Sequence, residues 1–344
     1  MKTIAFFDVK PYDRIFFDAL APGYDMSMKY IEAKLNADSV VLAEGCDGII
    51  AFVNDTIDEE TIAKMDSMGI RVLALRSAGY NNVDFKSAFG RVHVLRVPAY
   101  SPYAVAEHAM ALILALNRKT HRAYNRTRDY NFSLAGLTGF DLRGKTAGVI
   151  GTGRIGRVFI DICRGFGMNV IAYDPFPAEG SDIDYVTLDE LLARADVISL
   201  HCPLTKETHH ILDVRAFSLM KEGVYIINTS RGALIDAEAL LDSVKRHHVG
   251  AVGLDVYEEE EAYFFEDVSG EIMEDDTLAR LLSMPNVLVT GHQAFLTREA
   301  LENIARTTLD NLGAYYNGAP LANEVCYQCS KLGTCDHKHK DRCF

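Results

Sequence analysis

The 344-residue sequence has no excess of basic residues, no long hydrophobic run and no recognisable leader. Acidic residues outnumber basic ones, 48 to 35, for a net charge of −13. Such a chain gains nothing from counterion release, which argues against DNA and RNA as partners. The apolar run at 109–116 is far shorter than the ~20 residues of a membrane span. Asp8 follows the N-terminus too soon for a signal peptide. We therefore expect a cytoplasmic protein with no membrane span.

Composition and length favour a globular chain with more than one domain. Hydrophobic residues make up 49% of the sequence and charged residues 24%, which excludes disorder as the main state. A prior of one domain per ~150 residues predicts two domains, each long enough to bury its own core.

The seven cysteines do not have the pattern of a disulfide framework, because their number is odd and no secretory signal precedes them. The last nineteen residues, 326–344, form a separate Cys/His-rich tail. Its C-x2-C start is half of a possible zinc or iron–sulfur site, but the later spacing matches no standard finger. The tail is therefore either a metal site or a redox-active or disordered appendage. Its candidate ligands are Cys326, Cys329, Cys335 and Cys343.

Alternating strand and helix patterns predict an α/β fold with parallel sheets. The helix at 102–117 stands between two series of alternating strands and helices and is apolar almost all round. This predicts burial on every face, in a spine between domains or between subunits. The basic stretch after it, 118–128, fits a solvated or interface surface better than a functional patch. The expected strands are 3–8, 48–53, 71–75, 92–97, 146–150, 169–173, 197–200, 224–228, 251–255 and 287–290. The expected helices are 13–20, 58–68, 154–166, 188–193, 213–219 and 236–245.

The sequence G-T-G-R-I-G at 151–156 follows an apolar strand and opens an amphipathic helix. In a dinucleotide-binding turn, Gly151 allows the tight bend, Gly153 lets the backbone approach a pyrophosphate, and Gly156 lets the helix pack on the strand. The helix N-terminus then offers free N–H groups to the phosphates. Asp174, at the end of the next strand, accepts hydrogen bonds from ribose hydroxyls and repels a 2′-phosphate. These features predict NAD rather than NADP as the cofactor.

Three further polar groups follow expected strands. Arg231 suits bidentate binding of a carboxylate, and His292 is a natural proton donor near neutral pH. Between them, an acidic run follows Asp255, and the residues alone do not select one member of that run. An arginine, an acid and a histidine at strand ends beside a nicotinamide site suit the reduction of a 2-keto acid. His201 and Cys202 follow another strand, but an adjacent pair lacks the spacing of a metal site.

These motifs resemble the D-isomer-specific 2-hydroxyacid dehydrogenases over residues 1–325. Within the family, the segments at 52–55, 78–84, 97–102, 134–140 and 291–295 are most similar to the fermentative D-lactate dehydrogenases. The resemblance assigns substrate binding to Arg231, acid/base catalysis to His292, and the pairing with that histidine to Glu260.

The resemblance also implies the rest of the site. Asp255 would lie near the nicotinamide, with Thr229 and Ser230 near its ribose. The backbone of Ala78 and Gly79 would bind the substrate carboxylate. A small pocket for the substrate would be formed by Phe52, Tyr100 and Phe295. The alternative for each of these residues is ordinary core packing. Arg154 and Ile155 would contact the pyrophosphate of the cofactor. The cofactor-binding groove would be lined by Cys202, Pro203 and Thr208.

The fold that the resemblance implies has two doubly wound domains, with a Rossmann NAD domain (101–296) inserted into a flavodoxin-like substrate domain (1–100 and 297–325). The site would lie in the cleft between them. The expected reaction is pyruvate plus NADH to (R)-lactate, regenerating NAD in fermentation, in a homodimer or homotetramer. Two alternatives remain: a dehydrogenase for a bulkier D-2-hydroxy acid, and an NAD-sensing, corepressor-like scaffold.

Overall fold

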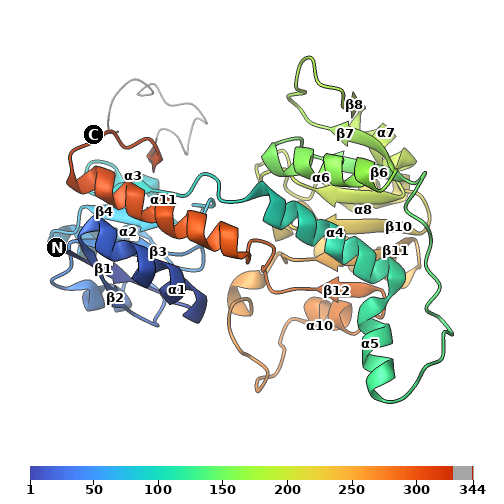
Figure 1. The fold of residues 1–344 in the computed structure, drawn as a ribbon, viewed down its shortest axis with the longest axis horizontal. Helices are drawn as coiled ribbons and strands as arrows, with labels where there is room; N and C mark the ends of the chain where they lie inside the picture. Colours follow the sequence, from blue (N-terminus) through green and yellow to red (C-terminus); the bar gives the residue numbers. More distant parts are fainter. Residues whose placement is uncertain (328–342, 344) are drawn as a thin grey trace. The chain divides into compact units, whose positions relative to one another are not determined.

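A computed structural model describes residues 1–327 and residue 343. The chain divides into two compact units. The first contains Met1–Ser101 and the chain from Thr297 onward, and the second, the inserted unit, contains Pro102–Leu296 (Figure 1). Each unit is described by itself below.

The first unit is built on a sheet with strand order β13-β5-β4-β3-β1-β2, in which only the pairing of β13 with β5 is antiparallel among the described strands. Apart from β13, this order is the 2-1-3-4-5 arrangement of a flavodoxin-like sheet. The strands are β1 (Lys2–Phe6), β2 (Met26–Tyr30), β3 (Gly48–Ala51), β4 (Val72–Leu75), β5 (His93–Leu95) and β13 (Glu324–Val325).

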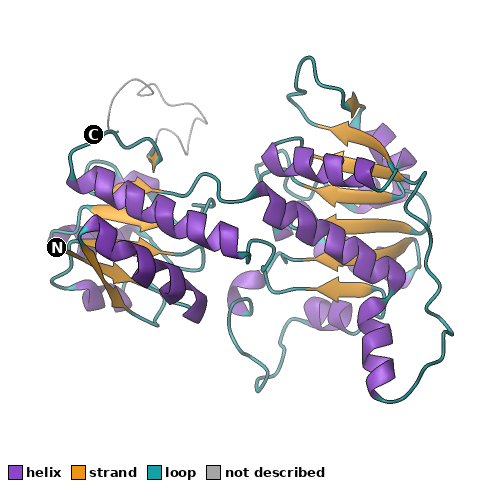
Figure 2. Ribbon diagram, in the orientation of Figure 1, coloured by secondary structure: helices purple, strands orange, loops and turns teal. Residues whose placement is uncertain are grey.

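Helices cover both faces of this sheet (Figure 2). Side chains of β1 alternate between two cores, as a strand covered on both faces requires. Ile4 packs with α1 and α11 on one side, and Ala5 lies in the core on the other side, which includes α2 and α3. The helices are α1 (Pro11–Leu20), α2 (Glu59–Ser67), α3 (Phe85–Ala88) and α11 (Arg298–Tyr316).

The inserted unit has an all-parallel sheet of order β12-β11-β10-β9-β6-β7-β8 among the described residues. If the strands are renumbered from β6 and read from β8 to β12, the order is 3-2-1-4-5-6 followed by one added strand. This is the Rossmann order, and the point at which the strand order reverses lies between β6 and β9. The strands are β6 (Thr146–Ile150), β7 (Asn169–Tyr173), β8 (Asp184–Tyr185), β9 (Val197–Leu200), β10 (Val224–Asn228), β11 (Val249–Leu254) and β12 (Val287–Val289).

One face of the inserted sheet packs against α4 and α6, which lie side by side (Figure 1). The other face packs against the remaining helices of the unit, except the peripheral α5. Aspartate or threonine caps begin several of them; Asp213 and Asp236, for example, accept backbone N–H bonds from residues three positions on. The helices are α4 (Pro102–Arg118), α5 (Thr120–Arg128), α6 (Arg154–Gly165), α7 (Leu188–Arg194), α8 (Val214–Leu219), α9 (Ala237–Lys245) and α10 (Asp276–Leu282).

The predicted fold class is confirmed: both sheets are parallel α/β sheets wound on two faces, apart from the antiparallel β13. Strand β2 escaped prediction because M-S-M-K-Y lacks the β-branched residues of the other strands. Helix α4 is buried on most sides, but Tyr103, Glu107 and Ala111 are exposed in the single chain and form a stripe along one side. Its apolar composition therefore exceeds what its own unit buries. Burial of this stripe between subunits stays a prediction.

In the part of the chain that the structure describes, no helix combines the length and hydropathy needed to cross a membrane.

Candidate active site

The glycine-rich loop begins where β6 ends. Gly151 has φ of +96°, and a Cβ there would lie 2.7 Å from the backbone N of Cys202. A Cβ on Gly156 would lie 2.0 Å from the carbonyl O of Gly151, so helix α6 can approach the loop only without a side chain at that position. A Cβ on Gly153 would meet nothing within 4 Å. Gly153 is also the N-cap of α6 and supplies no side-chain cap, which leaves the first amides of the helix available to an anion.

Asp174 lies directly after β7 and closes the same loop from the other side. Its Oδ2 accepts hydrogen bonds from the Thr152 backbone N–H at 2.7 Å and the Thr152 hydroxyl at 2.9 Å. Its Oδ1 accepts from the Phe176 N–H at 2.9 Å. An ionised carboxylate has about four acceptor sites, so Asp174 keeps capacity for ribose hydroxyls while its orientation is fixed.

Arg231 follows β10 and caps a 3-10 helix, Gly232–Leu234. The Asn228 side chain holds this turn by donating to the Arg231 carbonyl O at 2.8 Å and accepting from the Ser230 N–H at 3.0 Å. The half-buried Arg231 guanidinium donates to the Ser230 carbonyl O at 2.6 Å. A guanidinium has five N–H donors, so this contact leaves it able to bind a carboxylate with two parallel bonds.

His292 and Glu260 form a hydrogen-bonded pair in the inserted unit. His292 Nδ1 lies 2.8 Å from Glu260 Oε1, and the side chains are 19% and 16% exposed. Glu260 Oε2 also accepts the Tyr257 N–H at 3.0 Å, which fixes the carboxylate. Because Nδ1 faces the glutamate, Nε2 is the ring nitrogen left for another partner.

A buried carboxylate sets the loop that carries His292. Asp255, at the end of β11, is fully buried. Its Oδ1 accepts from the Thr290 hydroxyl at 2.6 Å and the Gln293 N–H at 2.9 Å, and its Oδ2 accepts from the Ala294 N–H at 2.8 Å. The His292 N–H donates to the Asp255 carbonyl O at 2.8 Å. These bonds hold His292 at its left-handed φ of +51°, a conformation that costs free energy in a non-glycine residue.

Two supporting residues escaped sequence reasoning. His108, on α4, places Nε2 3.0 Å from the Thr290 hydroxyl and 3.3 Å from Asp255 Oδ1. Phe265 packs against the His292 ring with centroids 5.4 Å apart. A histidine in an apolar helix and an aromatic residue in an acidic loop carry no spacing signal, so the sequence could not have identified them.

Comparison with known proteins identifies the family. The family model for the NAD binding domain of D-isomer specific 2-hydroxyacid dehydrogenases matches residues 110–294. A 2-hydroxyacid dehydrogenase homolog of Haemophilus influenzae is 50% identical over 327 residues, 94% of this chain and 98% of that protein. The chain belongs to the D-isomer specific 2-hydroxyacid dehydrogenase family.

Two further relatives agree with this assignment. The D-lactate dehydrogenase of Escherichia coli is 46% identical over 327 residues, which cover 94% of this chain and 99% of that protein. The solved structure of the pyruvate reductase of Chlamydomonas reinhardtii has a TM-score of 0.89 at 42% identity, covering 94% of this chain and 98% of that one. The predicted family and NAD cofactor are thereby confirmed, and the protein is an NAD-binding D-2-hydroxyacid dehydrogenase.

The residues of this dehydrogenase fit NAD. Beyond the glycine loop and Asp174, the buried Thr229 hydroxyl has no hydrogen-bond partner among the described residues, as expected of a group whose partner is a ligand. Ser230 donates to the Leu200 carbonyl O at 2.9 Å and stabilises the same turn. Arg154 is exposed and Ile155 half-buried in the first turn of α6.

The loop after β9 carries the other predicted groove residues. The Thr208 hydroxyl donates to the Pro203 carbonyl O at 2.7 Å, which closes a tight loop. Burial raises the pKa of the Cys202 thiol to about 11 and lowers the pKa of His201 to about 3. Both side chains are therefore neutral near pH 7. The role of Cys202 in the cofactor groove stays a prediction.

The predicted substrate residues are divided between the two units. Phe295 is buried in the inserted unit. In the first unit, Phe52 is buried with the Arg76 guanidinium 3.9 Å from its ring centroid. Ala78, Gly79 and Tyr100 are half-buried there, after β4 and β5. Their roles in substrate binding stay predictions.

Two of the four candidate metal ligands of the tail, Cys329 and Cys335, lie outside the described residues. Cys326 is buried and Cys343 is half-buried. The Cys343 N–H donates to Glu324 Oε2 at 2.6 Å, so Cys343 lies next to strand β13. Metal binding by the tail remains a prediction.

A pair of glycine substitutions tests the loop. Gly156→Ala forces a Cβ into the Gly151 carbonyl, so we expect a loss of roughly 1–3 kcal/mol in the free energy of unfolding. Gly153→Ala adds a methyl group in open space and should cost less than about 1 kcal/mol. Its methyl group should instead obstruct the pyrophosphate and weaken NADH binding about tenfold or more, a change of ~1.4 kcal/mol. Denaturant unfolding and NADH fluorescence titration measure the two effects; equal stability losses, or unchanged NADH binding by Gly153→Ala, would contradict this account.

Proposed function

We propose that the protein is an NAD-dependent D-lactate dehydrogenase that reduces pyruvate to (R)-lactate. The observation that carries the proposal is the 2.8 Å contact between His292 Nδ1 and Glu260 Oε1, in a unit that also presents Arg231 after a strand. The names of the relatives support pyruvate as the substrate: one is a D-lactate dehydrogenase and another a pyruvate reductase.

The substrate is held by its carboxylate and its carbonyl. The Arg231 guanidinium binds the carboxylate with two parallel N–H···O bonds and polarises the carbonyl. We propose that backbone groups of Ala78 and Gly79 also bind the carboxylate.

His292 delivers the proton. With Nδ1 directed at Glu260, the protonated imidazole presents its Nε2–H to the substrate carbonyl oxygen. The glutamate stabilises the imidazolium and fixes the ring orientation. Pyruvate C2 receives the hydride that NADH supplies when bound, the carbonyl oxygen takes the His292 proton, and the products are (R)-lactate and NAD.

A small pocket favours pyruvate over longer 2-keto acids. We propose that Phe52, Tyr100 and Phe295 surround the substrate methyl group. Bulky rings around a methyl group leave no volume for an isobutyl or benzyl side chain, and overpacking such a site typically costs ~1–3 kcal/mol.

A steady-state panel with NADH tests the function. We expect kcat/KM for pyruvate to exceed that for 2-ketoisocaproate and for phenylpyruvate by about tenfold or more, equivalent to ~1.4 kcal/mol of transition-state binding. A preference for either larger acid would instead favour the bulkier-substrate alternative. If no 2-keto acid is reduced by a preparation that binds NADH, the scaffold alternative would replace the enzyme proposal.

We also propose that the enzyme works as a homodimer or homotetramer in which a second copy covers the stripe on α4 and the segment after it. Helix α5 has no buried residue, and Tyr130 and Leu134 beyond it are 86% and 80% exposed in the single chain. Large apolar side chains exposed close together along one segment are typical of an interface. Light scattering after size exclusion should give the mass of two or four chains, and a monomer at micromolar concentration would contradict this. The cytoplasmic location stays a prediction.

A further inference from the structure

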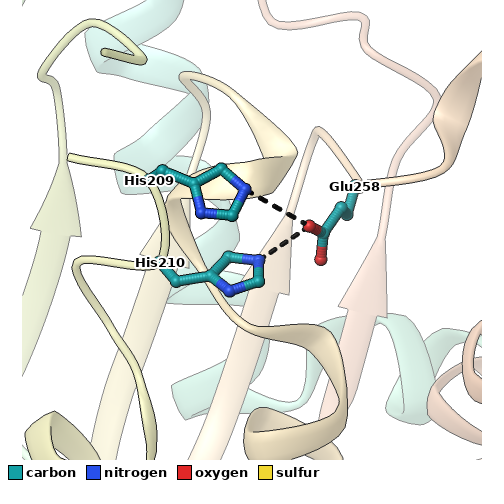
Figure 3. A group of neighbouring side chains, drawn as sticks. All are labelled: His209, His210 and Glu258. Carbon is teal, nitrogen blue, oxygen red and sulfur yellow. Dashed lines mark hydrogen bonds and ion pairs between the residues drawn. The ribbon is translucent and has the colours of Figure 1, made fainter. Parts of the chain in front are cut away.

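Two adjacent histidines and a glutamate, none of them part of the His292–Glu260 pair, converge in the inserted unit (Figure 3). His210 Nε2 lies 2.7 Å from Glu258 Oε1, and His209 Nε2 lies 4.0 Å from the same oxygen. The two imidazole rings stack with centroids 4.0 Å apart and direct their Nε2 atoms toward the carboxylate. Each residue offers one donor atom, and all three atoms lie within 4.8 Å of one another.

The backbone fixes both histidines. The His209 N–H donates to the Thr205 carbonyl O at 2.9 Å, and the His210 N–H donates to the Ala233 carbonyl O at 2.9 Å. His210 has a left-handed φ of +51°, which turns the chain there. The two histidines lie in a turn, and their rings stack on the same side of the chain.

Glu258 is held from the opposite direction. It follows Tyr257, whose side chain is buried, and its backbone lies against Gly232. A Cβ on Gly232 would lie 2.0 Å from the Tyr257 carbonyl carbon and 2.3 Å from the Glu258 N. The 3-10 helix Gly232–Leu234 therefore contacts both arms of the cluster, since its Ala233 accepts the His210 amide bond. The loops that carry the three donors pack against one another.

Two imidazole nitrogens and one carboxylate oxygen form a donor set that suits a divalent transition metal, above all Zn²⁺. Tetrahedral bonds of ~2.0–2.1 Å place neighbouring donors about 3.3 Å apart. The two contacts to Glu258, 2.7 Å and 4.0 Å, lie on either side of that value, and the separation of the two histidine donor atoms is no more than 4.8 Å, so metal binding would require side-chain rotations that bring all three separations close to 3.3 Å. The His209 side chain is 54% exposed and Glu258 25%, which leaves room for water as the fourth ligand.

We propose that His209, His210 and Glu258 form a zinc-binding site on the inserted unit, separate from the catalytic residues and from the cysteine-rich tail. The ordinary alternative is a hydrogen bond between His210 and Glu258 with His209 in solvent. The two differ in one property, because only a metal site requires His209. The proposal does not depend on the substrate of the enzyme.

Zinc stoichiometry of the full chain, prepared without a histidine tag, tests the site. The zinc bound at saturation is measured by equilibrium dialysis and metal analysis for the parent and for His209→Gln. We expect the variant to bind one equivalent fewer than the parent. His210→Asn should lose the same equivalent, and asparagine tolerates the left-handed backbone at that position. His247→Asn is the matched control, since His247 is also exposed and left-handed but lies outside the cluster, and it should bind as much zinc as the parent.

Cobalt absorption separates this site from the tail. Co²⁺ bound by nitrogen and oxygen gives visible bands without thiolate charge transfer, whereas cysteine ligands add a strong ultraviolet band. The proposal predicts that His209→Gln loses visible intensity and keeps any thiolate band. Equal zinc stoichiometry in the parent and in both cluster variants, with circular dichroism showing all of them folded, would overturn it.

Discussion

The carboxylate of Asp255 is the group on which the arrangement of the catalytic residues depends. It is fully buried at the end of β11 and accepts hydrogen bonds from Thr290, Gln293 and Ala294. A buried carboxylate without such partners would cost several kcal/mol, so the loop cannot leave it without a large loss of stability. The loop therefore keeps His292 in its left-handed conformation, within 2.8 Å of Glu260.

The remaining parts of the site come from the same sheet edge. The carboxyl ends of parallel strands β6, β7, β10 and β11 carry the glycine loop, Asp174, Arg231 and Asp255 respectively. Side chains and backbone amides at this edge converge because parallel strands all end there, which is why open α/β sheets bind ligands at this place. Short hydrogen bonds also hold the neighbouring loops, such as those of Asn228 with the turn at Arg231.

The sequence predicted the features that depend on the backbone. Gly151 and Gly156 reflect close approaches that a side chain would obstruct, whereas Gly153 stands in open space at the start of the helix. Asp174 is placed by the length of one strand–helix–strand unit. The acidic run after Asp255 was different, because adjacent glutamates look alike until their loop is folded. In the structure Glu258 contacts His210, whereas Glu260 contacts His292. The amino-acid composition of the run gives no information about which histidine each glutamate contacts. His108 and the exposed stripe of α4 were likewise invisible, since an apolar helix shows no pattern that separates its covered side from its exposed one.

The most direct measurement is the pH dependence of pyruvate reduction by Glu260→Gln at saturating NADH. A neutral amide stabilises an imidazolium less than a carboxylate does. The variant should therefore lose its protonated donor sooner as the pH rises, and kcat should decline at a lower pH than in the parent. Far-UV circular dichroism and NADH binding should match the parent, because glutamine has the size and shape of glutamate. A pH profile that coincides with that of the parent would contradict the pairing of Glu260 with His292 as the proton-donating unit.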